Sequence, residues 1–311
     1  MILQLERNSR EEAEHCRLSA TEGLSDGETP SIMKDQIIIK DWRAFSLGER
    51  IRHFEVEGYL VLPDLLTADD LAEIKAETRS LPTKAVDYSI HQQVCPGIQF
   101  AGGAITNLIA HEPTIQFLKM LFGQEVVMMA CDYARSEPGH PGISLHCDGQ
   151  PWGSEIFGYE HSCPRLVRVL YYLDDLTPDV SPFRVVPRSH LSFHADANPY
   201  LRYEEHPEQI KVTCEAGSAV LIQQNVVHGN YANTGTNPRE LIAIAYRPGW
   251  AGPAGDVPPW DDAELERVPQ SVRELMQDRN HRVWLPEGGN KPPEMRREAP
   301  GISPSRWDRT E

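Results

Sequence analysis

The sequence predicts a mainly β fold, a sandwich or barrel with flanking helices, and three observations support this. Short apolar runs follow one another between about residues 125 and 250, and turn signals with Gly, Pro, Asn and Asp separate them. No helical pattern fits between these runs, which argues against an alternating parallel α/β fold. The 311 residues are enough to bury a core without covalent cross-links.

We expect one domain with helical additions at both ends. Residues 1–36 are polar and weakly patterned, which is typical of a mobile segment. Residues 37–250 hold the predicted strands and N-terminal helices. Residues 251–311 indicate a helix followed by a Pro-rich arm, packed on the surface or on a second subunit. The individual elements predicted are strands within 37–42 and 58–66, a helix capped by Thr67, a helix over 111–123 closed by Gly123, and a helix within 261–280.

The composition argues against some classes of binding partner and indicates the cellular compartment. The formal net charge is −16 and the pI is near 5.2, which argues against nucleic acid or an anionic membrane as the main partner. No apolar run approaches the length of a spanning helix, and the first residues do not resemble a secretory signal. Six cysteines lie far apart without a CxxC motif, so we expect reduced thiols and a cytoplasmic protein.

The first candidate motif is His146-Cys147-Asp148, at the end of a predicted strand. Residues i and i+2 of a strand face the same side, so His146 and Asp148 would point together and Cys147 away. An imidazole and a carboxylate placed in this way can occupy two neighbouring positions on one metal ion. The motif alone is weak, because chance produces it in roughly one of three chains of this length.

A second histidine, His228, ends an apolar run just before a turn in VLIQQNVVHGN. A lone histidine in an apolar strand is more often a hydrogen-bonded core residue than a ligand. Together with His146 and Asp148, however, it completes two imidazoles and one carboxylate. This set is the facial triad of non-haem Fe(II) oxygenases, in which three positions stay open for a bidentate cosubstrate and dioxygen.

Arg239 begins the next predicted strand, eleven residues after His228. A hairpin of that length brings the start of the second strand back alongside the end of the first. A guanidinium in this place could hold a carboxylate through two hydrogen bonds. A surface arginine is the alternative, but the position beside a candidate ligand favours a binding role.

Taken in order, these motifs resemble the phytanoyl-CoA dioxygenase (PhyH) family of iron- and 2-oxoglutarate-dependent oxygenases. The resemblance covers about residues 50–250 and includes GYLVLPDLLTADDLAEI and YYLDDLTPDVSPFRVVPRSH. It implies a double-stranded β-helix, a cupin-like jelly roll. The roles that it implies are Fe(II) binding by His146, Asp148 and His228, an anchor for the distal carboxylate of 2-oxoglutarate at Arg239, and a further hydrogen bond to that carboxylate from Asn230, where serine is common.

The implied activity is that of a dioxygenase that hydroxylates, or otherwise oxidises, an unactivated C–H bond of a small-molecule metabolite and releases succinate and CO2. Its cofactors and cosubstrates would be Fe(II), 2-oxoglutarate and O2, with ascorbate as an optional reductant. Asp148 agrees with hydroxylation, because halogenating relatives carry a small residue in place of this carboxylate. Two alternatives remain: a non-catalytic jelly-roll module that binds a metal or ligand, and a metal-dependent hydrolase that uses zinc-bound water.

The chain departs from the family at two turns. Members often read Asn-Gly-Pro and Pro-Gly-Ser-His, whereas this chain has Ser181 and Arg188 at the glycine positions. We expect these exchanges to alter the loops beside the site rather than the metal ligands. His190, in the second turn, is expected to support that turn and not to bind metal.

Other candidates are weaker. Arg135 lies on the strand before the His146 motif and could face the cosubstrate, although its side of the strand cannot be fixed from the pattern. Gln150 and Trp152 follow the motif and could line the substrate entrance. His140 lies in a polar loop, where we expect it to be solvated. Lys211 is the only lysine between 125 and 250, which favours a substrate without CoA. The expected partners are thus a small-molecule substrate and, through the Pro-rich arm, a second copy in a homodimer.

Overall fold

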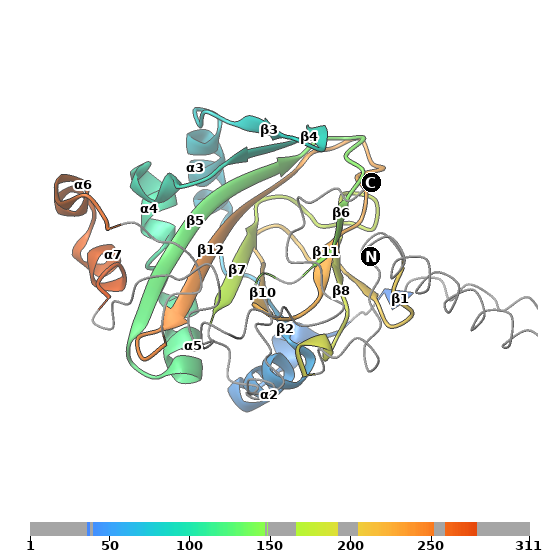
Figure 1. Cartoon of the computed structure of the whole chain (residues 1–311), viewed down its shortest axis with the longest axis horizontal. Helices are drawn as coiled ribbons and strands as arrows, with labels where there is room; N and C mark the ends of the chain where they lie inside the picture. The colour runs from blue at the N-terminus through green and yellow to red at the C-terminus, as the bar shows by residue number, and fades with distance from the viewer. Residues whose placement is uncertain are drawn as a thin grey trace, which may run out of the picture. The chain divides into compact units, whose positions relative to one another are not determined.

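The fold consists of two β-sheets with helices around them (Figure 1). The computed structural model describes residues 36–37, 40–146, 148, 166–191, 205–251 and 259–278, all within one compact unit, Asp35–Glu311. The larger sheet has the strand order β2 (Tyr59–Leu62), β10 (Ala219–Gln223), β7 (Val167–Tyr172), β12 (Arg239–Pro248), β5 (Val126–Ser136), β4 (Ser89–Cys95) and β3 (Lys84–Val86). The smaller sheet has the order β1 (Gln36–Ile37), β9 (Ile210–Val212), β8 (Phe183–Val185), β11 (His228–Asn230) and β6 (Ile143–His146).

The strands are connected as in a double-stranded β-helix. From β5 onward the chain passes back and forth between the sheets: β5, β7, β10 and β12 belong to the larger one, and β6, β8, β9 and β11 to the smaller one. Neighbouring strands are antiparallel, except for the parallel pair β1 and β9. The jelly roll that the family resemblance implies is therefore confirmed.

The helices confirm part of the prediction and correct the rest. They are η1 (Trp42–Ala44), α2 (Leu47–Glu57), α3 (Ala68–Thr78), η2 (Ile98–Phe100), α4 (Gly103–Leu108), α5 (Glu112–Phe122), η3 (Ser189–Leu191), α6 (Asp262–Arg267) and α7 (Gln270–Leu275). Thr67 caps α3 as predicted, and its hydroxyl accepts a hydrogen bond from the Asp70 backbone N–H. The helix predicted over 111–123 is α5, and Gly123 follows its last residue.

Two local predictions differ from the structure, and two helices were not predicted. The helix expected within 261–280 is two short helices, because Pro269 has no N–H to continue the first one. Of the strand expected over 37–42, Ile37 belongs to β1, residues 38 and 39 lie outside the described part of the chain, and a 3-10 turn begins at Trp42. Helices α2 and α4 were not predicted at all.

The two faces of the larger sheet differ. Its outer face is covered by helices: the Tyr171 hydroxyl donates to Thr114 Oγ1 of α5 at 2.7 Å, and the Tyr246 hydroxyl donates to the Ile109 carbonyl at 2.8 Å. The residues next in the strands, such as Tyr172, face the smaller sheet. This inner face is where the candidate site lies.

Two further expectations can be compared with the described residues. No helix among them is long and apolar enough to cross a membrane. The three described cysteines, Cys95, Cys131 and Cys214, carry free thiols.

Candidate metal centre

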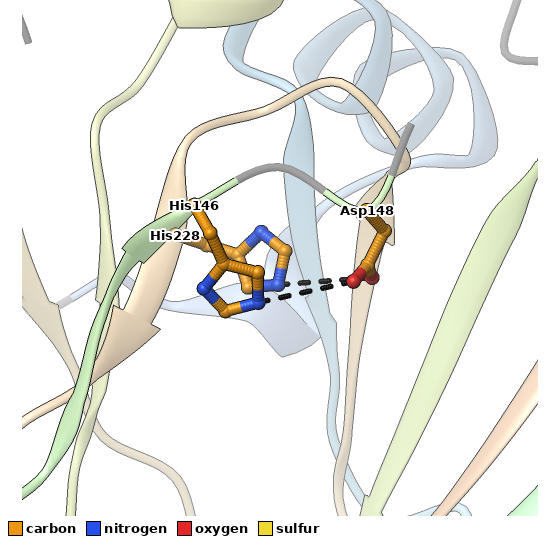
Figure 2. A group of neighbouring side chains, drawn as sticks. All are labelled: His146, Asp148 and His228. Carbon is orange, nitrogen blue, oxygen red and sulfur yellow. Dashed lines mark ion pairs between the residues drawn. The ribbon is translucent and has the colours of Figure 1, made fainter. Parts of the chain in front are cut away.

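His146, Asp148 and His228 come together between the two sheets (Figure 2). His146 ends β6, His228 begins β11, and the two residues are direct partners in the antiparallel register. One ligand atom from each residue of the trio lies within 4.8 Å of the other two. The two imidazole Nε2 atoms each lie 3.8 Å from an Asp148 carboxylate oxygen. Two atoms that each bind a metal at about 2.1 Å can be up to about 4.2 Å apart, so the two 3.8 Å separations suit a single shared ion.

Backbone contacts orient both rings as metal ligands. His146 Nδ1 lies 2.8 Å from the Ser144 carbonyl, and His228 Nδ1 lies 2.9 Å from the Val226 carbonyl. A carbonyl oxygen only accepts, so each neutral ring carries its proton on Nδ1. Each Nε2 is then an unprotonated donor atom for a metal, which is the usual arrangement of ligating histidines.

The chain around His228 is fixed from both sides. The Val227 N–H donates to Ser189 Oγ at 2.7 Å, and the Phe183 ring stacks on the His228 ring with centroids 5.8 Å apart. Gly229 follows because β11 runs very close to β6: a Cβ at this position would lie 2.4 Å from the Ile143 carbonyl oxygen. His190 lies outside the trio, where its Nε2 bonds the Glu55 carbonyl at 2.8 Å.

Asp148 is held by a residue that no sequence motif indicated. Its backbone N–H donates to the Gln224 carbonyl at 2.8 Å. Its carboxylate Oδ2 lies 2.6 Å from Nε of Arg168, on β7 of the opposite sheet. Arg168 sits in the middle of an apolar strand, RLVRVLYYL, and only knowledge of which strand faces the site could have identified it.

Arg239 forms a second polar cluster on the inner face of the larger sheet. Its side chain is buried, with 1% of the residue exposed, and it donates to Ser136 Oγ, which in turn donates to Gln92 Oε1 at 2.5 Å. The guanidinium carbon lies 5.9 Å from the centre of the Tyr172 ring. Burial lowers the pKa of Arg239 from its ordinary value.

No carboxylate in the described part of the chain pairs with Arg239. Every ion pair found there involves another cation. A buried guanidinium without a counter-ion is energetically costly, because it has lost its hydration and gained little in return. Its surroundings therefore suit the carboxylate of a bound molecule.

The remaining candidates are placed as follows. Asn230 is buried on β11, donates to the Ser181 carbonyl at 3.3 Å, and lies close enough to Tyr172 to influence its hydroxyl. Arg135 lies away from the Arg239 cluster: it ion-pairs with Glu137 at 2.8 Å, and its neighbour in the strand, not Arg135, contacts Arg239. Alternation along the strand is the reason, since consecutive residues face opposite sides. Gln150 and Trp152 lie outside the described residues.

The expectation for His140 was wrong. This residue is 0% exposed, and burial, followed by the positive Arg239 and by His91, lowers its pKa to about 4. His140 is thus a neutral imidazole in the same polar cluster as Arg239. Its loop reads as polar because Gly, Pro and Glu surround it, which hides the burial of a single side chain.

Comparison with known proteins agrees with this geometry. The sequence profile of the phytanoyl-CoA dioxygenase (PhyH) family matches residues 54–241. Ectoine dioxygenase of Nocardia farcinica (strain IFM 10152) is 24% identical over 238 residues, which are 64% of this chain and 77% of that protein.

Solved structures share the fold. The 2-oxoglutarate-dependent epimerase SnoN from nogalamycin biosynthesis superposes with a TM-score of 0.57 and 18% identity over 69% of this chain and 88% of SnoN. HygX from Streptomyces hygroscopicus, solved with nickel, 2-oxoglutarate and hygromycin B bound, gives a TM-score of 0.55 and 18% identity over 65% of this chain and 87% of HygX. Because the family profile covers more than half of the sequence, the chain belongs to the phytanoyl-CoA dioxygenase family and is an iron- and 2-oxoglutarate-dependent oxygenase, as its motifs predicted.

Proposed function

We propose that this protein oxidises an unactivated C–H bond of a small-molecule metabolite, with Fe(II) held by His146, Asp148 and His228 and 2-oxoglutarate anchored by Arg239. One observation supports this assignment above all others. The inner faces of the two sheets hold both the three ligand atoms, within 4.8 Å of one another, and the buried guanidinium of Arg239, which has no ion-pair partner among the described carboxylates. A metal alone would need only the trio, whereas a metal with a chelating dicarboxylate needs both.

Each residue has a defined task. The Nδ1 hydrogen bonds hold the two imidazoles with Nε2 toward the ion, and Asp148 supplies the one negative ligand. Arg239 orients the cosubstrate by its far carboxylate, through charge-assisted hydrogen bonds. Bound iron, with 2-oxoglutarate and O2, supplies the oxidising power, and succinate and CO2 are the coproducts. The surrounding buried residues restrict water at the reacting centre.

For the substrate we propose a small metabolite without a CoA group. Lys211 is the one lysine between residues 125 and 250, so this part of the chain offers few lysines to the phosphates of a CoA group. Ectoine is the first compound to screen, because the relative from Nocardia farcinica is named for its oxidation. We also propose a cytoplasmic protein with no nucleic-acid or membrane partner, since its charge is −16 and its described cysteines are free.

The test is succinate formation by anaerobically iron-loaded protein after O2 is admitted, with Asp148→Ala beside the wild type. We expect the variant to lose turnover entirely, because the remaining imidazoles bind Fe(II) too weakly. Unaltered turnover in the variant would refute the ligand assignment. A wild type that binds iron and 2-oxoglutarate but releases no succinate, with or without a metabolite library, would indicate the non-catalytic binding module. Hydrolysis that survives Arg239→Ala would indicate the zinc enzyme.

A further inference from the structure

Arg168 contacts the carboxylate that the proposed function assigns to iron. Its Nε lies 2.6 Å from Asp148 Oδ2, and both side chains are largely withdrawn from solvent, with 25% of Arg168 and 7% of Asp148 exposed. Arg168 is on β7 of the larger sheet, and Asp148 lies two residues beyond the end of β6 of the smaller sheet. The ion pair therefore joins the larger sheet to the segment that carries the candidate ligand Asp148.

The contact distinguishes the two carboxylate oxygens. Oδ1 lies 3.8 Å from His146 Nε2 and Oδ2 lies 3.8 Å from His228 Nε2, but Oδ2 is the oxygen that has the Arg168 guanidinium against it, at 2.6 Å. A carboxylate with one oxygen held by a guanidinium presents the other oxygen for coordination. We propose that Arg168 is a positioning residue that keeps Asp148 a one-oxygen ligand. This inference rests on the proposed function, because it takes the trio to be the iron site.

The number of ligands makes this restraint important. Two imidazoles and one carboxylate oxygen leave three of six positions on the ion. A chelating 2-oxoglutarate takes two of them and dioxygen needs the third. If Asp148 were to bind through both oxygens, one position would be lost and the cosubstrates would compete for the remaining two. Arg168 prevents this by occupying Oδ2 from the side of the larger sheet.

The chain offers a closely matched control. Arg43 Nε also lies 2.6 Å from a carboxylate oxygen, Oδ2 of Asp64, but this pair lies on the surface, with 56% of the Arg43 side chain exposed. Arg43→Gln thus removes, outside the site, an ion pair with the same Nε–Oδ2 distance, together with a second contact of Arg43 to Glu215. Arg168→Lys keeps the charge and loses the fork of the guanidinium, so that it tests for partial rescue.

The experiment measures Ni(II) binding to metal-free protein by calorimetry, and then 2-oxoglutarate binding to the Ni(II)-loaded protein. Ni(II) replaces Fe(II) so that no turnover or oxidation interferes. We expect Arg168→Gln to keep Ni(II) at the trio but to weaken 2-oxoglutarate binding by about 10- to 100-fold, because Asp148 can then coordinate through both oxygens and take a position that the cosubstrate needs. Arg168→Lys should recover part of the 2-oxoglutarate affinity, and Arg43→Gln should match the wild type.

The possible results distinguish a failure of the Arg168 role from a failure of the proposed iron site. Wild-type protein that binds no Ni(II), or binds it equally well after His146→Ala, would overturn the iron site and the role of Arg168 with it. Site-specific Ni(II) binding together with a 2-oxoglutarate affinity that Arg168→Gln leaves within about twofold of that of Arg43→Gln would overturn the positioning role alone. If Arg168→Gln does not fold, the same comparison is made between Arg168→Lys and Arg43→Lys, and equal affinities would overturn the role.

Discussion

Two arginines on the inner face of the larger sheet differ in their surroundings, and this difference determines which carboxylate each of them can bind. Arg168 on β7 and Arg239 on β12 lie on adjacent strands. Arg168 is partly exposed and already neutralised by Asp148, whereas Arg239 is 1% exposed and is hydrogen-bonded to a neutral hydroxyl. The first arginine can act on a carboxylate of the protein itself. The second retains its charge for a carboxylate that arrives with a ligand.

Replacing Arg239 should have the largest effect, because it should weaken cosubstrate binding and leave metal binding at the trio unchanged. We expect Arg239→Gln to weaken 2-oxoglutarate binding to the Ni(II)-loaded protein by about 100-fold, because charge-assisted hydrogen bonds in a buried place are lost. Ni(II) affinity should stay within about twofold of wild type, since Arg239 does not contact the trio. Titration calorimetry measures both constants. A variant that binds 2-oxoglutarate as tightly as wild type would show that the cosubstrate lies elsewhere.

The Arg239 region should also make the metal-free protein sensitive to acid. His140 has a pKa of about 4 in the folded state and about 6.5 when unfolded, and His53 is lowered to about 4 in the same way by burial and Lys40. Between these values the unfolded chain binds more protons. The free energy of unfolding is therefore fully retained above about pH 6.5 and falls toward pH 4, by up to about 3 kcal/mol from His140.

Urea unfolding of the metal-free protein at pH 7 and pH 5 measures this effect. His140→Gln removes one titrating group. The free energy of unfolding of this variant should therefore fall less between pH 7 and pH 5 than that of the wild type. An equal loss in both proteins would show that His140 does not carry the acid sensitivity.

The smallest expected effects are changes in the free energy of unfolding caused by substitutions in two turns, one near Arg239 and one near His228. Ser181, whose carbonyl accepts from Asn230 near Arg239, has φ of 48°, and Arg188, in the turn that holds His228, has φ of 66°. Both stand where the family often has glycine, and the left-handed conformation is retained. Each of Ser181→Gly and Arg188→Gly should therefore raise the free energy of unfolding by about 0.5 to 1 kcal/mol. Thermal or urea unfolding would measure this, and a loss of stability in both variants would contradict it.

The sequence predicted those parts of the molecule that depend on local pattern. The i, i+2 spacing placed His146 and Asp148 on one side of the chain, and Thr67 with its acidic neighbours located the start of α3. Helix α2 was missed because only Phe54 among its residues is buried, so its apolar periodicity is faint. The short α4 begins at Gly103, which gives no helix signal.

Features that depend on the meeting of distant strands could not be predicted. The contact of Arg168 with Asp148 requires knowledge of which strand of the larger sheet faces the end of β6. The position of Arg135 depends on which of two alternating faces is inner, and a run with both polar and apolar residues on each face does not decide this. The burial of His140 arises from packing against other loops, which leaves no trace in its own neighbours.

The register between β6 and β11 has a consequence for how the protein holds together. Because His146 and His228 are cross-strand partners, an ion bound to both would cross-link two chain segments that are far apart in the sequence. Such a cross-link would oppose local opening of β6 and β11, which are short strands with few backbone hydrogen bonds. Iron bound at the trio would therefore support this sheet as well as the oxidation, and we expect the metal-free protein to be cleaved more readily by a protease.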